Sequence, residues 1–172
     1  PNALYRNRGD GTFEDVSRQS GIAAHIGKAM SVAAADYDLD GRPDLFVTND
    51  KIPNFLFHNR RDGTFEEVAL AAGVALADHG QPISSMGAEF RDYDNDGLPD
   101  LCVVTSEGAS LWRNEQGKFT RQGGALVKGS FRKAVWLDYD HDYDLDLVLL
   151  GDGAALLRNQ CPAGFADRTR DF

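Results

Sequence analysis

The chain has 172 residues, of which 42% are hydrophobic, and its formal net charge is −9. This length and hydrophobic content suit one domain with a sizeable core and argue against disorder. Such an acidic chain is unsuited to nucleic acid, and no apolar run approaches the ~18 residues of a membrane span. Because the chain begins at Pro1 without a methionine or a signal segment, we expect a mature or excised fragment.

Two short motifs alternate along the chain. The first joins an apolar pair to a basic residue and Asn, then to Gly and Phe after a turn, and its copies begin at Leu4, Leu56, Leu111 and Leu156. The second is an acidic loop, found at 36–45, 92–101 and 138–147. The acidic loops recur after 56 and then 46 residues, a period in the range of propeller blades and larger solenoid units.

In chain order, residues 2–16 supply only the last two strands of a blade. In each full period, illustrated by the first, a strand at 30–35 enters the acidic loop and an apolar strand at 45–48 leaves it. Two further strands, 54–58 and 64–68, meet at an Asp-Gly turn. Four short antiparallel strands per period describe one blade of a β-propeller.

We therefore predict an all-β fold in which residues 1–172 form a single propeller segment, part of a larger propeller or of an assembly. After the half blade at 2–16, three full blades lie near 30–68, 86–122 and 132–168. The linker after the first full blade is rich in Ala and Gly, and we expect a helical turn near 67–72.

Each acidic loop places carboxylates at positions 1, 3, 5 and 9. Without these twelve aspartates the net charge of −9 would become +3, so the acidity is local. Like charges this close repel by about 1 kcal/mol per pair even in water, whereas Ca²⁺ binds about six to eight oxygens, including backbone carbonyls such as that of position 7. We predict about three Ca²⁺ ions, held by Asp36, Asp38, Asp40, Arg42 and Asp44; by Asp92, Asp94, Asp96, Leu98 and Asp100; and by Asp138, Asp140, Asp142, Asp144 and Asp146.

Two rival metal sites fit less well. An EF-hand needs a bidentate Glu at position 12, where these loops have Val47, Val103 and Leu149. Magnesium demands a stricter octahedron and keeps its waters. The third loop is the weakest, because Tyr143 replaces the glycine of position 6, so we expect either a distorted loop or Tyr143 in the left-handed conformation.

The remaining metal-binding residue types show no such pattern. Cys102 lies in an apolar run and is expected to be a small buried hydrophobe, while a Cys102–Cys161 disulfide stays open as an alternative. The four histidines share no ligand spacing, so none is expected to bind a metal: His25, His58, His79 and His141.

The D-x-D-x-D-G-x-x-D-L segments at 36–45 and 92–101, the degenerate copy at 138–147 and the phrase NRGDGTFEDV at 7–16 resemble the FG-GAP/VCBS repeat family. Such repeats form the calcium-binding blades of integrin α-subunit propellers and of many secreted bacterial proteins. The phrase is similar to repeats of ASPIC/UnbV-linked and cartilage-acidic-protein-like proteins. The resemblance covers nearly the whole chain and implies the same aspartate ligands, although the literal Phe-Gly and Gly-Ala-Pro motifs are absent. Family propellers usually have about twice as many blades.

These features favour a calcium-binding, non-catalytic module for adhesion or for binding a protein or glycan ligand, placed outside the cell or in the periplasm, where calcium is abundant. An alternative is a structural subunit that self-assembles into an oligomer or filament through its open half blade. A third is a propeller-fold polysaccharide-active enzyme, but the sequence offers no cluster of catalytic groups, so we expect no enzymatic activity.

Overall fold

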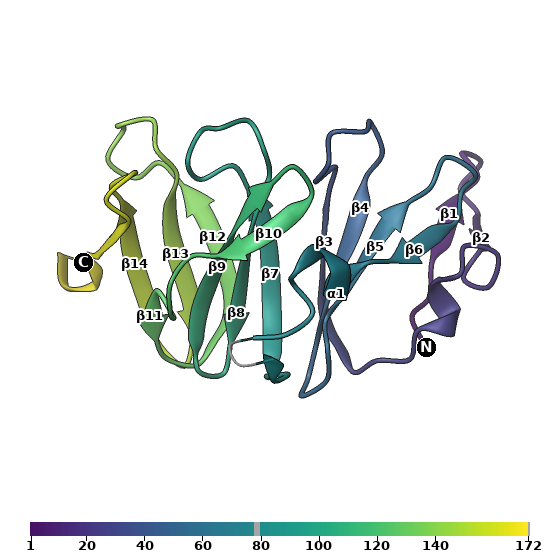
Figure 1. Cartoon of the computed structure of the whole chain (residues 1–172), viewed down its shortest axis with the longest axis horizontal. Coiled ribbons are helices and arrows are strands. Elements are labelled where there is room, and N and C mark those ends of the chain that lie inside the picture. Colours follow the sequence, from purple (N-terminus) through teal and green to yellow (C-terminus); the bar gives the residue numbers. More distant parts are fainter. Residues whose placement is uncertain (78–79, 172) are drawn as a thin grey trace.

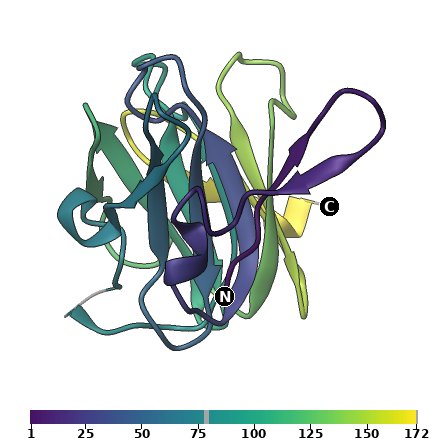
Figure 2. The same cartoon turned by 90° about the vertical axis from the view of Figure 1, so that its right-hand side faces the viewer.

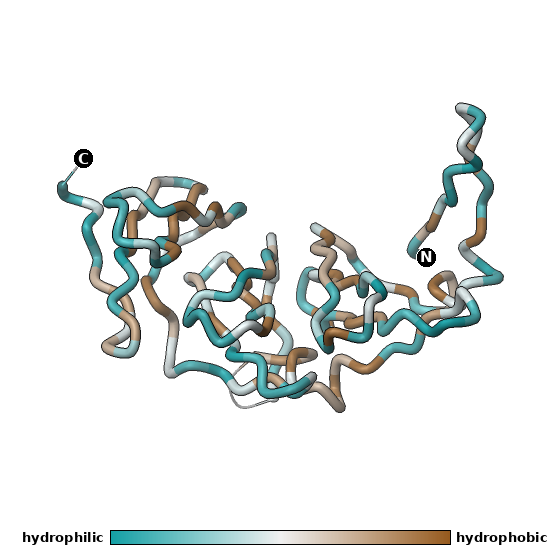
Figure 3. Tube along the Cα trace, turned by 90° about the horizontal axis from the view of Figure 1, so that it is seen from above, coloured by the Kyte–Doolittle hydropathy of each residue, from teal (hydrophilic) through white to brown (hydrophobic). Residues whose placement is uncertain are grey.

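The structure is a computed structural model that describes residues 1–77 and 80–171, so that His79 lies outside it. Three sheets stand side by side, each with four antiparallel strands in sequence order, and a two-stranded hairpin precedes them (Figure 1). Seen from above, the sheets follow an arc with the hairpin beyond one end (Figure 3). The predicted all-β fold of four-stranded antiparallel blades is confirmed.

The strands follow the repeat of the sequence. The hairpin consists of β1 (Tyr5–Asn7) and β2 (Phe13–Asp15). The first blade contains β3 (Ala29–Ala35), β4 (Asp44–Asn49), β5 (Phe55–Asn59) and β6 (Phe65–Glu67). The second contains β7 (Ser85–Arg91), β8 (Asp100–Thr105), β9 (Gly108–Glu115) and β10 (Lys118–Arg121), and β11 (Val127–Lys128) pairs with the start of β9. The third contains β12 (Phe131–Leu137), β13 (Asp146–Gly151), β14 (Ala154–Asn159) and β15 (Phe165–Asp167).

Short helices follow the fourth strands. These are η1 (Ile22–Ala24) after the hairpin, α1 (Ala69–Ala72) after the first blade and η3 (Thr169–Asp171) after the third. The α1 helix confirms the turn predicted for this linker. In the described ranges, no helix has the length and apolar character that crossing a membrane requires.

The second strand of each blade reads as a continuous apolar run, and in the middle blade every residue of this strand is buried, so both of its faces lie inside the protein. In β8, Leu101 and Val103 belong to the core shared with the first blade, whereas Cys102 and Val104 belong to the core shared with the third. Successive side chains of a strand point to opposite faces, so one run of four residues contributes to two cores. The blades are therefore joined by hydrophobic packing along their full faces.

The two interfaces between neighbouring blades are built in the same way. The first strands lie innermost, with β7 between β3 and β12. The core between the first two blades includes Phe46, Leu56, Ala69, Phe90, Leu101 and Trp112. The core between the last two includes Cys102, Leu111, Phe131, Ala134, Leu147 and Leu157.

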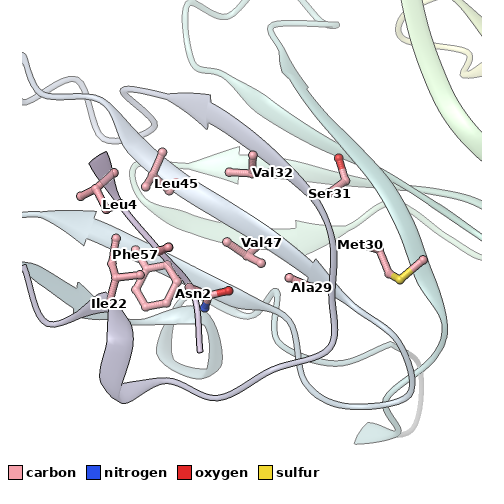
Figure 4. Close-up of a pocket in the computed structure, with 11 residues that line it drawn as sticks. Asn2, Leu4, Ile22, Ala29, Met30, Ser31, Val32, Leu45, Val47 and Phe57 are labelled. Atoms are coloured by element: carbon pink, nitrogen blue, oxygen red, sulfur yellow. The ribbon is translucent and has the colours of Figure 1, made fainter. Parts of the chain in front are cut away.

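The outer faces of the two end blades are open. On the first blade, Met30 and Val32 are 47% and 61% exposed, and on the third, Val135 and Leu150 are 37% and 42% exposed. Leu4 packs on the outer face of the first blade, in a cluster with Phe57. Leu4, Phe57 and Val32 are among the residues that line an apolar groove on this face (Figure 4). The β1–β2 hairpin projects away from the blades beside it (Figure 2).

Both cysteines are free thiols. Cys102 is buried, as predicted for a small hydrophobe, and burial raises its pKa to about 12. Cys161 is half-buried. Because both thiols are free, the alternative Cys102–Cys161 disulfide is not formed.

Candidate metal centres

The three acidic loops connect the first and second strands of their blades and lie along the same edge of the arc (Figure 1). Each loop is closed by its position 1 carboxylate, which accepts from two backbone N–H groups. Asp36 accepts from Asp40 N at 2.9 Å and from Gly41 N at 2.8 Å. Asp92 and Asp138 make the corresponding pairs at 2.8–3.2 Å. All three loops therefore share one backbone arrangement.

The position 9 carboxylates lie at the base of the loops, where the second strands begin. Asp44, Asp100 and Asp146 are at most 1% exposed. Each accepts one backbone N–H from position 2 of its loop and one from the Asn of its third strand, as Asp100 does from Tyr93 at 3.2 Å and Asn114 at 2.7 Å. These hydrogen bonds hold the carboxylates in place and leave lone pairs free to meet a cation.

Burial raises the pKa of Asp44 to about 6 and that of Asp100 to about 7, and it raises the pKa of Asp146 as well. The cause is that a carboxylate removed from water loses the solvation of its charged form. The next largest contributions, the hydrogen bonds from backbone N–H groups, oppose this rise only in part. A divalent cation in the loop would supply the missing stabilisation of the charged form.

The position 3 carboxylates give a second indication that a cation belongs in the loops. One buried oxygen has no hydrogen-bond partner in each of Asp38, Asp94 and Asp140. Carboxylate oxygens of the first three acidic positions lie within 4.8 Å of one another in Asp36, Asp38 and Asp40 and again in Asp92, Asp94 and Asp96, and the third loop groups Asp138, Asp140 and Asp146 in the same way. An all-oxygen set with spare acceptor capacity fits a hard cation such as Ca²⁺.

The residues of position 7 differ in what their side chains do. The Arg42 guanidinium pairs with Asp40 and donates to the carbonyl of Asn59 at 2.7 Å. Leu98 is half-buried. The carboxylate of Asp144 accepts from the Asn95 side chain at 2.9 Å and so connects the second and third loops.

The third loop keeps its shape despite its missing glycine. Tyr143 adopts a left-handed conformation, with φ of 72°, where Gly41 and Gly97 have 87° and 89°. Position 4 is also left-handed in every loop, at Leu39, Asn95 and His141, with φ of 58–63°. Non-glycine residues adopt this conformation at an energetic cost. Of the two alternatives for the third loop, the structure shows Tyr143 in the left-handed conformation.

One group of site residues was missed by sequence reasoning, namely a basic side chain from the third strand of each blade. Arg113 Nε lies 2.7 Å from Asp94, and its Nη2 lies 3.0 Å from Asp96. Arg158 bridges Asp140 and Asp142 at 2.5 and 3.0 Å. In the first blade His58 takes this position, contrary to the expectation that no histidine joins a ligand cluster. The sequence pattern that could have revealed these residues is the basic residue that precedes Asn in every copy of the first motif.

The Asn that follows this basic residue connects neighbouring blades. Asn114 Nδ2 donates to the carbonyl of Tyr37 in the preceding loop at 2.7 Å and to that of Pro99 at 3.0 Å. Asn159 does the same to Tyr93 at 2.8 Å and to Leu145 at 3.2 Å. Each acidic loop that has a following blade is therefore braced by it.

Comparison with known proteins agrees with this geometry. The FG-GAP-like repeat matches residues 1–47, 36–103 and 92–149. The chain is 30% identical over 155 residues to cartilage acidic protein 1 of Homo sapiens, a match that covers 86% of this chain and 22% of that protein. The protein of the same name from Xenopus tropicalis is 28% identical over 149 residues, which cover 82% of this chain and 22% of the relative. The chain thus spans about a fifth of the length of these relatives. Because the repeat matches most of the sequence, the chain belongs to the FG-GAP-like repeat family.

Proposed function

We propose that the chain is a calcium-binding, non-catalytic module in which one Ca²⁺ per acidic loop stabilises a rigid, ligand-presenting edge. The observation that carries the proposal is that every loop combines a buried position 9 carboxylate with a buried position 3 oxygen that has no hydrogen-bond partner among the described residues. The loop carboxylates of positions 1, 3, 5 and 9 would hold the ion. When bound, the ion would supply positive charge that the loops lack.

Charge balance supports a divalent ion. The second loop has four aspartates, and Arg113 offsets one of them. A net excess of about three negative charges in one turn is costly, even at the high dielectric of the surface. A bound Ca²⁺ removes most of this excess and adds direct bonds to the oxygens.

The setting proposed for this module is the extracellular space or the periplasm. Loops without the bidentate Glu of an EF-hand suit the millimolar calcium found outside cells. The relatives are named for cartilage, an extracellular tissue. The ligand of the module is proposed to be a protein or a glycan that contacts the loop edge.

Equilibrium dialysis at millimolar calcium tests this proposal directly. We expect three equivalents of Ca²⁺ per chain and two for Asp94→Asn, which removes a ligand charge with little change of shape. Asp62→Asn serves as the control, since Asp62 lies in a hairpin turn outside the loops, where it accepts from the backbone and side chain of Thr64. Three equivalents bound by Asp94→Asn, or none bound by the unmodified chain, would contradict the proposal.

A second candidate function, self-assembly, is favoured by the open face of the first blade. The β1–β2 hairpin corresponds to the outer strands of a blade, and Val16 N donates to Leu4 O at 3.0 Å, just as Val68 N donates to Leu56 O at 2.8 Å. The described residues therefore include only the outer two strands of this blade. The apolar groove beside Val32 is a surface against which further strands or another copy would pack.

Sedimentation velocity over a range of concentrations tests this candidate. Association with another copy through this open face predicts a mass that rises with concentration and a loss of association in Val32→Lys, which places a charge on the outer face. Leu70→Lys is a matched control, because Leu70 is 74% exposed and lies on α1, away from the groove. A monomer at every concentration would eliminate this candidate.

A further inference from the structure

The first acidic loop differs from the other two in the residue that its third strand supplies. Arg113 and Arg158 are replaced by His58 at the same position of β5. The imidazole Nδ1 lies 3.4 Å from Asp38 Oδ2 and 3.3 Å from Asp44 Oδ1. An imidazole, unlike a guanidinium, can donate a lone pair to a metal ion.

This nitrogen has the character of a free ligand. Among the described residues, the buried His58 Nδ1 has no hydrogen-bond partner, and neither has one buried oxygen of Asp38. The ring packs edge-on against Tyr37, with centroids 6.2 Å apart, and this contact holds the imidazole toward the carboxylates. Asp44 is fully buried, while the His58 and Asp38 side chains are 22% and 27% exposed, so the three groups form a partly sheltered cluster that solvent ions can reach.

The two separations from the imidazole nitrogen to the carboxylate oxygens match a particular class of ion. Zinc forms bonds of about 2.0–2.1 Å to imidazole and carboxylate, and two ligands of a tetrahedron with such bonds lie about 3.3–3.4 Å apart. The separations of 3.4 and 3.3 Å from Nδ1 to the two oxygens fall at this value. Imidazole also favours zinc and its neighbours over calcium and magnesium, whose preferred ligands are oxygens.

We infer that the first blade carries a transition-metal site of the zinc class, formed by His58 Nδ1, Asp38 and Asp44 with water as the fourth ligand. The other two loops lack this nitrogen, and their arginines leave them as oxygen-only sites. The inference rests on the proposed function in taking the first loop to hold a divalent cation. It adds that this loop prefers a different ion, so that zinc and calcium would compete for Asp38 and Asp44.

Cobalt absorption provides the primary measurement, because tetrahedral Co²⁺ with a nitrogen ligand absorbs visible light strongly and calcium does not. We expect one equivalent of Co²⁺, displaced by Zn²⁺, in the unmodified chain. His58→Arg, which copies the other blades, should lose at least ~10-fold in Zn²⁺ affinity, since even indirect partners of a ligand contribute that much. His141→Gln controls for adventitious binding by an exposed histidine of the third loop.

A variant that gains a zinc site is a useful second test, because a misfolded protein would lose binding and would not gain it. Arg113→His places an imidazole at the same position in the second blade and should raise the number of Zn²⁺ ions bound from one to two. Zn²⁺ binding that survives His58→Arg but falls in His141→Gln would overturn the inference, as would an Arg113→His chain that gains no site.

Dialysis with labelled calcium separates this inference from the proposed function. If both hold, Zn²⁺ reduces bound Ca²⁺ from three equivalents to two in the unmodified chain and leaves three in His58→Arg. If no loop binds calcium while one Zn²⁺ still depends on His58, the proposed function fails and the inference stands. If three Ca²⁺ bind and Zn²⁺ displaces none, the inference fails and the proposed function stands.

Discussion

Removal of calcium with excess chelator is expected to lower the melting temperature of the chain by about 15 °C or more. A ligand that binds only the folded state stabilises it by about 2.7 kcal/mol at a hundredfold excess over its dissociation constant. Three filled loops would together contribute about 8 kcal/mol. For a domain of this size each kcal/mol shifts the melting temperature by about 2–4 °C. Differential scanning calorimetry with and without chelator measures the shift.

Two controls distinguish bound ions from general screening. Added NaCl screens repulsion between exposed aspartates, but it cannot reach the one buried oxygen of Asp38 or the fully buried Asp44. We therefore expect salt to recover only a small part of the loss, Mg²⁺ to recover somewhat more, and Ca²⁺ to recover all of it. Equal melting temperatures with and without chelator would remove the structural role assigned to the loops.

The architecture of the blades could be predicted because it depends on local patterns. Residues 101–104 read as an apolar run flanked by a turn, and a strand buried on both faces has that pattern. The position 9 aspartates were recognised from spacing alone. Their burial, at the base of each loop, follows from their place as the first residue of the second strand.

What could not be predicted depends on strand register and on contacts between blades. His58 meets Asp38 only because β5 pairs with β4, which places a residue 20 positions away beside the loop. The bond from Asn114 to Tyr37 spans 77 residues and joins two blades. Neither contact can be derived from the spacing of residue types, although the recurrence of a basic residue and Asn in every period indicated that both had a role.

Substitution of Asn114 by Ala is expected to reduce the free energy of unfolding by about 3–5 kcal/mol. The Asn114 side chain is buried and donates to the carbonyls of Tyr37 and Pro99, while its Oδ1 accepts from Gly117 N at 2.8 Å. Its removal leaves three backbone groups without partners, and each unsatisfied buried group costs about 1–3 kcal/mol. Urea denaturation at saturating calcium measures the loss.

Asn59→Ala is the matched control, because Asn59 occupies the same position in the blade with the open face. Among the described residues its side chain donates only to Pro43 O, at 2.9 Å, in its own blade. We expect that substitution to cost about 1 kcal/mol, the contribution of a single hydrogen bond. If Asn114→Ala and Asn59→Ala were equally stable, the blades would be joined by hydrophobic packing alone, and the loop edge would owe none of its rigidity to the asparagines.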